Sequence, residues 1–91
     1  MGSGDTSPTP LYAVVKGAIA YDGALPLAAL RTYVAIAAAG AWREWVAGRA
    51  PTLARRLGYA VSTVYAALHT LVARGYLAYR RIRRQGWYQL A

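Results

Sequence analysis

The chain has 91 residues, which is enough for one small domain with a single core. Apolar residues make up 57% of it, a share that excludes a disordered chain. Eleven basic residues, ten of them Arg, oppose three acidic residues and give a formal net charge of +8. This excess favours a polyanionic partner, either nucleic acid or an anionic membrane surface. The alternative is a basic protein whose charge serves only solubility, and such a protein would carry its charge evenly.

Several residue types that site chemistry requires are scarce. The absence of Cys excludes disulfides, thiol catalysis and Cys-ligated zinc, and the single histidine, His69, is too little for a His-based metal site. We therefore expect no cofactor, no metal and no small-molecule ligand. Residues 1–10 lack the basic and apolar regions of a signal peptide, and the apolar run of residues 32–42 is too short to cross a bilayer. These features predict a cytoplasmic protein with no membrane partner.

Most of residues 1–10 are Gly, Ser, Thr or Pro, which predicts a flexible N-terminal segment. Residues 11–91 are expected to form a single domain. The first part of that domain, residues 11–23, fits either a short helix or a strand. We favour a short helix because three apolar residues would then share one helical face: Leu11, Val15 and Ile19.

Residues 26–39 have the pattern of a longer helix. Pro26 suits the first helical turn, where its missing N–H is not needed, and Gly40 suits the C-terminal cap. Apolar residues recur at intervals of three and four, which predicts one buried face. That face would comprise Leu27, Leu30, Val34 and Ala37.

The next segment has the signals of a short strand and two helices joined by a tight turn. The strand is expected at residues 45–47, and Pro51 then opens a helix that Gly58 ends. A further helix is expected over residues 61–74, with Gly75 directly after it.

After Gly75 the hydrophobic period becomes that of strands, and the remaining residues have the pattern of a β-hairpin. The stretch RRQG is expected to supply its turn, with Gly86 free to adopt a positive φ. Alternation separates the side chains of the first strand into two faces. One face would carry Leu77, Tyr79, Arg81 and Arg83, and the other Ala78, Arg80, Ile82 and Arg84.

Residues 50–69 resemble the winged helix-turn-helix superfamily, whose pattern is L-A-x-x-L-G, a hydrophobic residue, then Thr-Val and spaced leucines. The matching positions are Leu53, Ala54, Leu57, Gly58, Tyr59, Thr63, Val64, Leu68 and Leu71. The stretch ARGYL that follows resembles the family's exit into the wing. The resemblance covers about residues 26–91 and implies a fold that is mainly α with a small β-hairpin (α+β): a three-helix core plus a C-terminal wing. Residues 23–40 also resemble the first helix of winged-helix domains in replication initiators and in phage or plasmid regulators.

The resemblance implies duplex DNA as the partner and the third helix as the reading element. Its groove-facing candidates are Ser62, Thr63, Tyr65, Ala66, His69 and Thr70. Two departures from the family weaken this helix as a reader. Ala60 stands at its N-cap, where Ser or Thr is usual, and no Arg, Lys, Gln or Asn stands at the base-reading positions. Hydroxyl groups can position the helix on phosphates without specifying a sequence. A plain surface or a protein-binding face is the alternative interpretation.

The arginines of the hairpin are the strongest functional signal. Arg80, Arg81, Arg83 and Arg84 crowd five positions, and the chain has too few acids to pair with them. Such a cluster fits contact with phosphates or with a narrow minor groove. Gln85 is a candidate for a base edge, while Arg55 and Arg56 are candidates for backbone contacts or are simply solvated surface residues.

Together these patterns predict a small non-enzymatic DNA-binding protein: a transcriptional repressor, a replication-control factor or an architectural protein. Many such domains bind as two-fold dimers, and a homodimer is expected here. The first helix would allow close packing between chains through Ala35, Ala38 and Ala39. The rival function is a winged-helix protein-interaction module that does not read DNA. RNA binding is a weaker alternative, because the sequence shows no platform for single strands.

Overall fold

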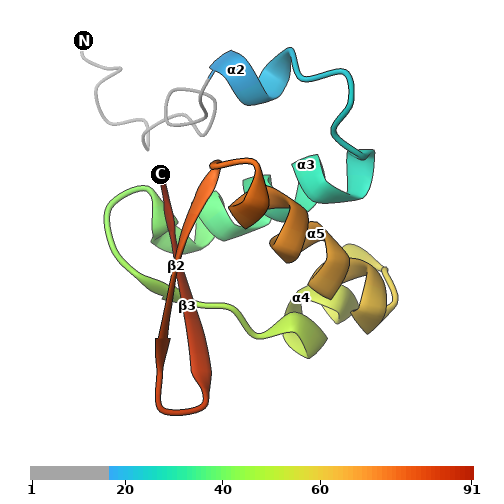
Figure 1. Cartoon of the computed structure of the whole chain (residues 1–91). Helices are drawn as coiled ribbons and strands as arrows, with labels where there is room; N and C mark the ends of the chain where they lie inside the picture. Colours follow the sequence, from blue (N-terminus) through green and yellow to red (C-terminus); the bar gives the residue numbers. More distant parts are fainter. Residues whose placement is uncertain (1–16) are drawn as a thin grey trace, which may run out of the picture.

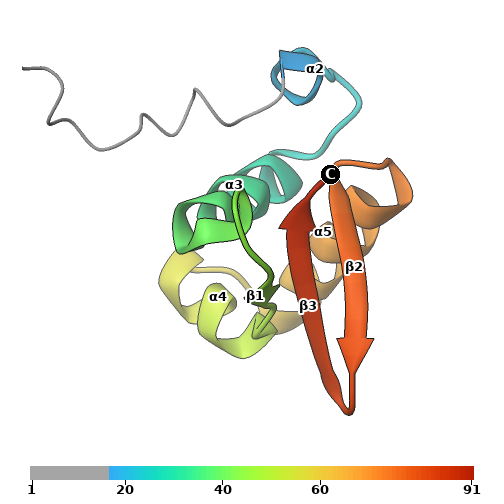
Figure 2. The same ribbon diagram turned by 90° about the vertical axis from the view of Figure 1, so that its left-hand side faces the viewer.

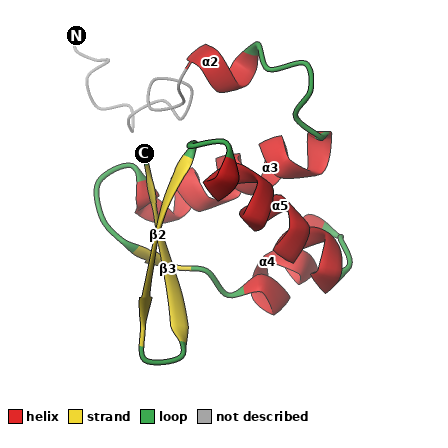
Figure 3. Cartoon of the chain, viewed as in Figure 1, coloured by secondary structure: helices red, strands yellow, loops and turns green. Residues whose placement is uncertain are grey.

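A computed structural model describes residues 17–91 of the chain, and the expected N-terminal segment 1–10 lies outside the described residues. Helices and a small sheet follow in the order typical of a winged helix-turn-helix (Figures 1 and 3). The elements are α2 (Gly17–Ala20), α3 (Leu27–Ile36), the π-helical turn η2 (Ala37–Ala41), β1 (Val46–Ala47), α4 (Ala50–Leu57), α5 (Val61–Ala73), β2 (Leu77–Ile82) and β3 (Gln85–Leu90). The expected fold class, mainly α with a small antiparallel sheet, is confirmed.

Helix α3 ends at Ile36, earlier than the predicted residue 39, and its buried face agrees only in part with the expected one. Gly40, expected as the C-terminal cap, lies inside the wide turn η2 with a φ of +110°, so the helical path is kinked there and η2 ends at Ala41. The side chain of Leu27, expected in the core, is 67% exposed. The buried residues of α3 are instead Ala29, Thr32, Tyr33 and Ile36. Of the expected face, Ala37 is fully buried and Leu30 packs against the core, so the expectation was wrong for Leu27. The buried face is centred on Tyr33 and Ile36 rather than on the leucines. The Thr32 hydroxyl donates a hydrogen bond to the Ala28 carbonyl at 2.7 Å, and this bond offsets the cost of burying the hydroxyl.

Helices α4 and α5 form the helix-turn-helix, and a glycine makes their turn. Pro51 lies in the first turn of α4, and Gly58 after its last residue has a φ of +75°. Tyr59 then donates its backbone N–H to the Ala54 carbonyl at 2.9 Å, which closes the helix end. Ala54 is 3% exposed and small enough for α5 to cross α4 closely. At the start of α5, Ala60 is the N-cap residue without a side-chain cap bond, as the sequence predicts.

The wing is a hairpin of β2 and β3, and β1 completes a three-stranded antiparallel sheet in the order β1-β3-β2. Its turn differs from the expected one. Ile82 pairs with Gln85, so Arg83 and Arg84 alone form the connection, and Arg83 carries the positive φ, +59°. Gly86 lies within β3 opposite Arg81 and has no positive φ. The expected faces of β2 hold up to the turn, with Tyr79 opposite Tyr88.

The core lies where α3, α5 and the base of the sheet meet (Figure 2). Its largest fully buried side chains include Tyr33, Ile36, Val64 and Leu71. Ile19 of α2, 1% exposed, joins the same cluster, so the short helix before α3 also packs on the domain. A single core therefore holds the described helices and the sheet together.

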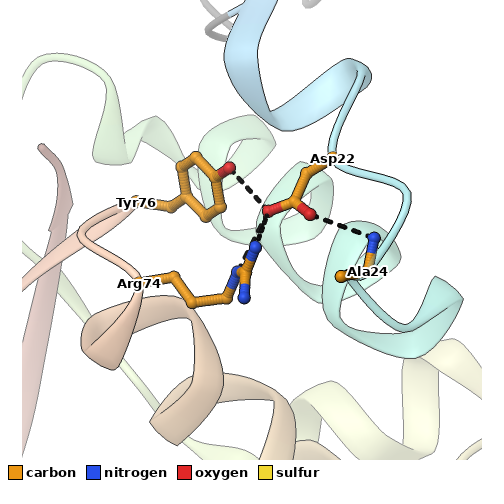
Figure 4. Close-up of polar contacts among 4 residues, drawn as sticks. All are labelled: Asp22, Ala24, Arg74 and Tyr76. Atoms are coloured by element: carbon orange, nitrogen blue, oxygen red, sulfur yellow. Dashed lines mark hydrogen bonds and ion pairs between the residues drawn. The ribbon is translucent and has the colours of Figure 1, made fainter.

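A polar cluster fixes the segment between α2 and α3 to the end of α5 (Figure 4). The Asp22 carboxylate accepts hydrogen bonds from the Arg74 guanidinium and, at 2.8 Å, from the Tyr76 hydroxyl. Its second oxygen accepts the backbone N–H of Ala24 at 3.1 Å. The Asp22 side chain is only 9% exposed. The hydrogen bonds from Tyr76 and Arg74 hold the pKa of Asp22 below its usual value.

This cluster predicts an acid-sensitive component of stability. Because the pKa of Asp22 is lowered by folding, its contribution is complete above the ordinary Asp value of 3.8 and is lost as pH falls through the lowered pKa. Asp22→Asn removes that component at neutral pH. We expect urea-unfolding midpoints of the wild type and Asp22→Asn to differ at pH 7 and to converge below pH 3.8. Glu44→Gln, at an exposed acid, is the matched control, and a constant gap between wild type and Asp22→Asn at all pH values would contradict the assignment.

Candidate nucleic-acid interface

The outer face of α5 forms an exposed ridge made of small and polar residues. Ser62, Tyr65, Ala66 and His69 are exposed, with Tyr65 at 59%. The opposite face of α5 carries the buried residues Val64, Ala67, Leu68 and Leu71. The ridge therefore projects from a rigid helix without any fixed charge of its own.

Two hydroxyl residues expected on this ridge lie to one side of it. The side chains of Thr63 and Thr70 are half-buried. Both line a shallow hollow together with Pro26 and Ala29, at the start of α3. Ala66 borders the same hollow. A helical period of 3.6 places these residues towards α3, so they are further from any ligand lying along the ridge.

The wing projects beyond the helices, as both views of the ribbon show (Figures 1 and 2). Its four arginines are all exposed. Within residues 17–91 the ion pair present joins Arg74 to Asp22, so none of the wing arginines is neutralised by an acid. Arg80 lies over the Trp45 ring, with its guanidinium carbon 4.7 Å from the ring centroid, a cation–π contact that orients it.

Arg81 and Arg84 reach a groove between the wing and the start of α4. The groove has a volume of about 450 Å³. Arg49, directly before α4, lines it from the other side, and Thr52 and Tyr65 complete its walls. Three arginines therefore line one concave surface beside the α5 ridge. Like charges so placed repel one another, and an anionic ligand in the groove would relieve that repulsion.

Two glycines shape the floor of this groove. A side chain at Gly48 would overlap the Tyr88 ring, and a Cβ at Gly86 would lie 3.0 Å from the Tyr79 ring. The absence of both side chains lets the two tyrosine rings pack together, with centroids 5.2 Å apart. Partial burial raises the pKa of Tyr88 above its ordinary value of 10.0. Gly86 therefore allows the close approach of a tyrosine ring and does not serve the turn.

The start of α4 adds partial positive charge to the same groove. Arg49 is its N-cap residue and makes no side-chain cap bond, and Pro51 and Thr52 of the first turn line the groove. The first N–H groups of a helix lack intrahelical acceptors, and the helix dipole favours an anion near them. Sequence reasoning missed Arg49. Its position just before a proline-opened helix was the available signal.

The remaining candidates are distributed differently. Gln85 lines the groove, but its amide nitrogen already donates to the Gly86 carbonyl at 2.9 Å. Arg56 borders a separate apolar hollow with Leu53, Leu57 and alanines of α3 and η2, so the structure does not bring it to the groove. Arg55 is exposed on α4 and does not line the groove either.

Comparison with known proteins identifies the central part of this arrangement. Residues 46–81, from β1 through most of β2, match the family model of the IclR helix-turn-helix domain. The match and the fold show that the chain carries a winged helix-turn-helix DNA-binding domain of the kind found in transcription regulators. No curated protein and no solved structure is significantly similar to the chain. Among the described residues no helix is long and apolar enough to span a membrane, and no three potential metal ligands lie together.

Proposed function

We propose that the chain binds duplex DNA with the α5 ridge in the major groove and the wing against the adjacent backbone and minor groove. One observation carries this proposal: Arg49, Arg81 and Arg84 line one groove beside the ridge, and no acid within residues 17–91 pairs with them. A phosphate in that groove would accept charge-assisted hydrogen bonds from guanidinium groups. The hydroxyls of Thr52 and Tyr65 would add further donors at the same place.

Under this proposal, affinity and sequence reading come from different parts of the molecule. Ser62, Ala66 and His69 on the ridge carry no fixed charge and offer few donors to base edges. The wing supplies charge, which is attracted to every DNA sequence alike. Most of the binding affinity is then electrostatic, and the preference for one DNA sequence over another is small. Such binding suits a repressor, a replication-control factor or an architectural protein without catalytic activity. The cytoplasmic location expected from the sequence stays a prediction.

We also propose that the chain binds as a homodimer through α3 and α4. One continuous apolar surface there is lined by Leu30, Val34, Ala35, Ala38 and Leu57, with Arg31 and Arg56 at its border. This surface lies away from the groove and so leaves the arginines accessible to DNA. The same surface is what the rival function, a protein-interaction module, would use for a different protein. A dimer would place two recognition helices about one DNA turn apart.

The proposed function predicts steeply salt-dependent binding. If about five phosphates are neutralised per chain, the logarithm of the affinity falls with the logarithm of salt at a slope of roughly −4 to −5. Fluorescence anisotropy of a labelled mixed-sequence duplex at several salt concentrations measures this slope. Sedimentation of the same complexes gives the number of chains per duplex, two being expected. Binding that ignores salt, or no binding at low salt, contradicts the electrostatic proposal, and one chain per duplex at tens of micromolar contradicts the dimer.

A further inference from the structure

The tip of the wing presents an apolar side chain among arginines. Ile82, the last residue of β2, is 49% exposed and directly precedes the turn residues Arg83 and Arg84. Strand β1 supports the hairpin only as far as Gly86, whose carbonyl accepts the Gly48 N–H at 3.0 Å. Beyond that bond the wing is a bare two-stranded ribbon that extends past the helices (Figure 2). Ile82 therefore lies at the far end of a narrow projecting arm.

Two features of the wing tip contribute little to the stability of the fold. Half of the Ile82 side chain gains nothing from the core, and the two-residue turn places Arg83 at a φ of +59°, where Gly or Asn is usual. A non-glycine residue in this left-handed region is destabilising. A single exposed isoleucine is common and needs no explanation by itself. Here, however, the exposed apolar residue and the strained arginine are neighbours at the apex of the element that carries the cluster of wing arginines Arg80, Arg81, Arg83 and Arg84.

We propose that Ile82 is a wedge that enters between two base pairs from the minor groove and bends the DNA. The inference rests on the proposed function and adds a specific act to it. The minor groove is about 6 Å wide, which admits a narrow ribbon edge, and proteins that bend DNA from that side insert apolar side chains between base steps. Arg83 would then contact a phosphate at the edge of the minor groove, which offsets part of the cost of unstacking the two base pairs.

The surrounding charge favours DNA over a protein pocket as the occupant. Ile82 lies between Arg81 and Arg83 in the chain, and the strand alternation places it on the same face as Arg80. Burying this side chain in an apolar protein pocket would bring several guanidinium groups out of water without partners. The minor groove offers phosphates along both of its edges, so the arginines keep ionic partners while the isoleucine is covered.

The wedge is tested by measuring DNA bending with Ile82→Ala. A duplex of about four helical turns, labelled with a fluorescence donor and acceptor at its ends, carries either a central TA step or a stiff A-tract. We expect the wild type to shorten the end-to-end distance of the TA duplex and to bind it more tightly than the A-tract. With Ile82→Ala we expect at least half of the bend and most of the TA preference to disappear, with an unchanged salt slope because no charge is removed.

Leu27→Ala, which truncates an aliphatic side chain that is 67% exposed on α3, is the matched control and should leave the bend unchanged. Thermal unfolding of each variant verifies folding. Salt-dependent binding to straight DNA by the wild type, or equal bending by wild type and Ile82→Ala, overturns the wedge and leaves the proposed function intact. Failure of the wild type to bind either duplex at low salt overturns both. Bending that depends on Ile82 supports both.

Discussion

Replacing Arg81 and Arg84 by alanine should weaken binding to every duplex by roughly 60-fold at 0.1 M salt. Both side chains line the groove beside the α5 ridge, and neither has an acidic partner within the described residues. Removing one guanidinium–phosphate interaction reduces the steepness of the salt dependence by about 0.9. Removing two therefore lowers the affinity gained between 1 M and 0.1 M salt by about 1.8 log units. Anisotropy titrations over that range measure both the affinity and the slope.

A charge-matched control separates a local effect from a change in net charge. Arg43→Ala with Arg55→Ala also removes two positive charges, but Arg43 lies over the Trp42 ring, Arg55 is exposed on α4, and neither lines the groove. This pair should change the salt slope by much less than the groove pair. Equal decreases in affinity from the two pairs would show that net charge alone drives binding and that the groove has no special role.

The helix ridge should behave in the opposite way. Conservative changes at Ser62, Ala66 and His69 remove no fixed charge, so the salt slope stays nearly constant while any sequence preference changes. Their effect on the affinity for a random duplex should be small compared with that of the groove pair. The two sets of substitutions should differ because the ridge contacts DNA without fixed charge, whereas the wing contacts it through arginines.

Most helix boundaries were predictable because they are set by residues at the helix ends themselves. Gly58 and Gly75 end helices with positive φ, and Pro51 lies in the first turn of α4, so glycine and proline chemistry alone set most boundaries. The candidate interface was predictable only in part. Its wing arginines are adjacent in sequence, whereas Arg49 and Tyr65 reach the groove through tertiary packing. No local sequence pattern indicates that the start of α4 lies beside the hairpin formed by β2 and β3.

Two errors show what a single sequence does not specify. Gly86 looked like a turn glycine, yet its role is to leave room for the Tyr79 ring across the hairpin. The register of the hairpin decides this, and register depends on which side chains pack against the helices. The face of α3 was wrong for a related reason. An apolar stripe of Leu and Val predicts burial, but the residues that α3 buries are Ala29, Thr32, Tyr33 and Ile36.

The corrected face of α3 leads to a large expected difference between two chemically identical substitutions. Leu71 is fully buried in the core, so Leu71→Ala should lower the free energy of unfolding by about 2 to 5 kcal/mol, through reduced apolar burial and the cavity left behind. Small domains have only about 5 to 15 kcal/mol in total, so much of the stability goes with it. Leu27 is 67% exposed at the first residue of α3, where alanine is also a good helix former. Leu27→Ala should therefore change the unfolding free energy by no more than about 0.5 kcal/mol. Urea denaturation of both variants measures the two values, and a decrease at Leu27 equal to that at Leu71 would restore the leucine-rich face of α3 to the core.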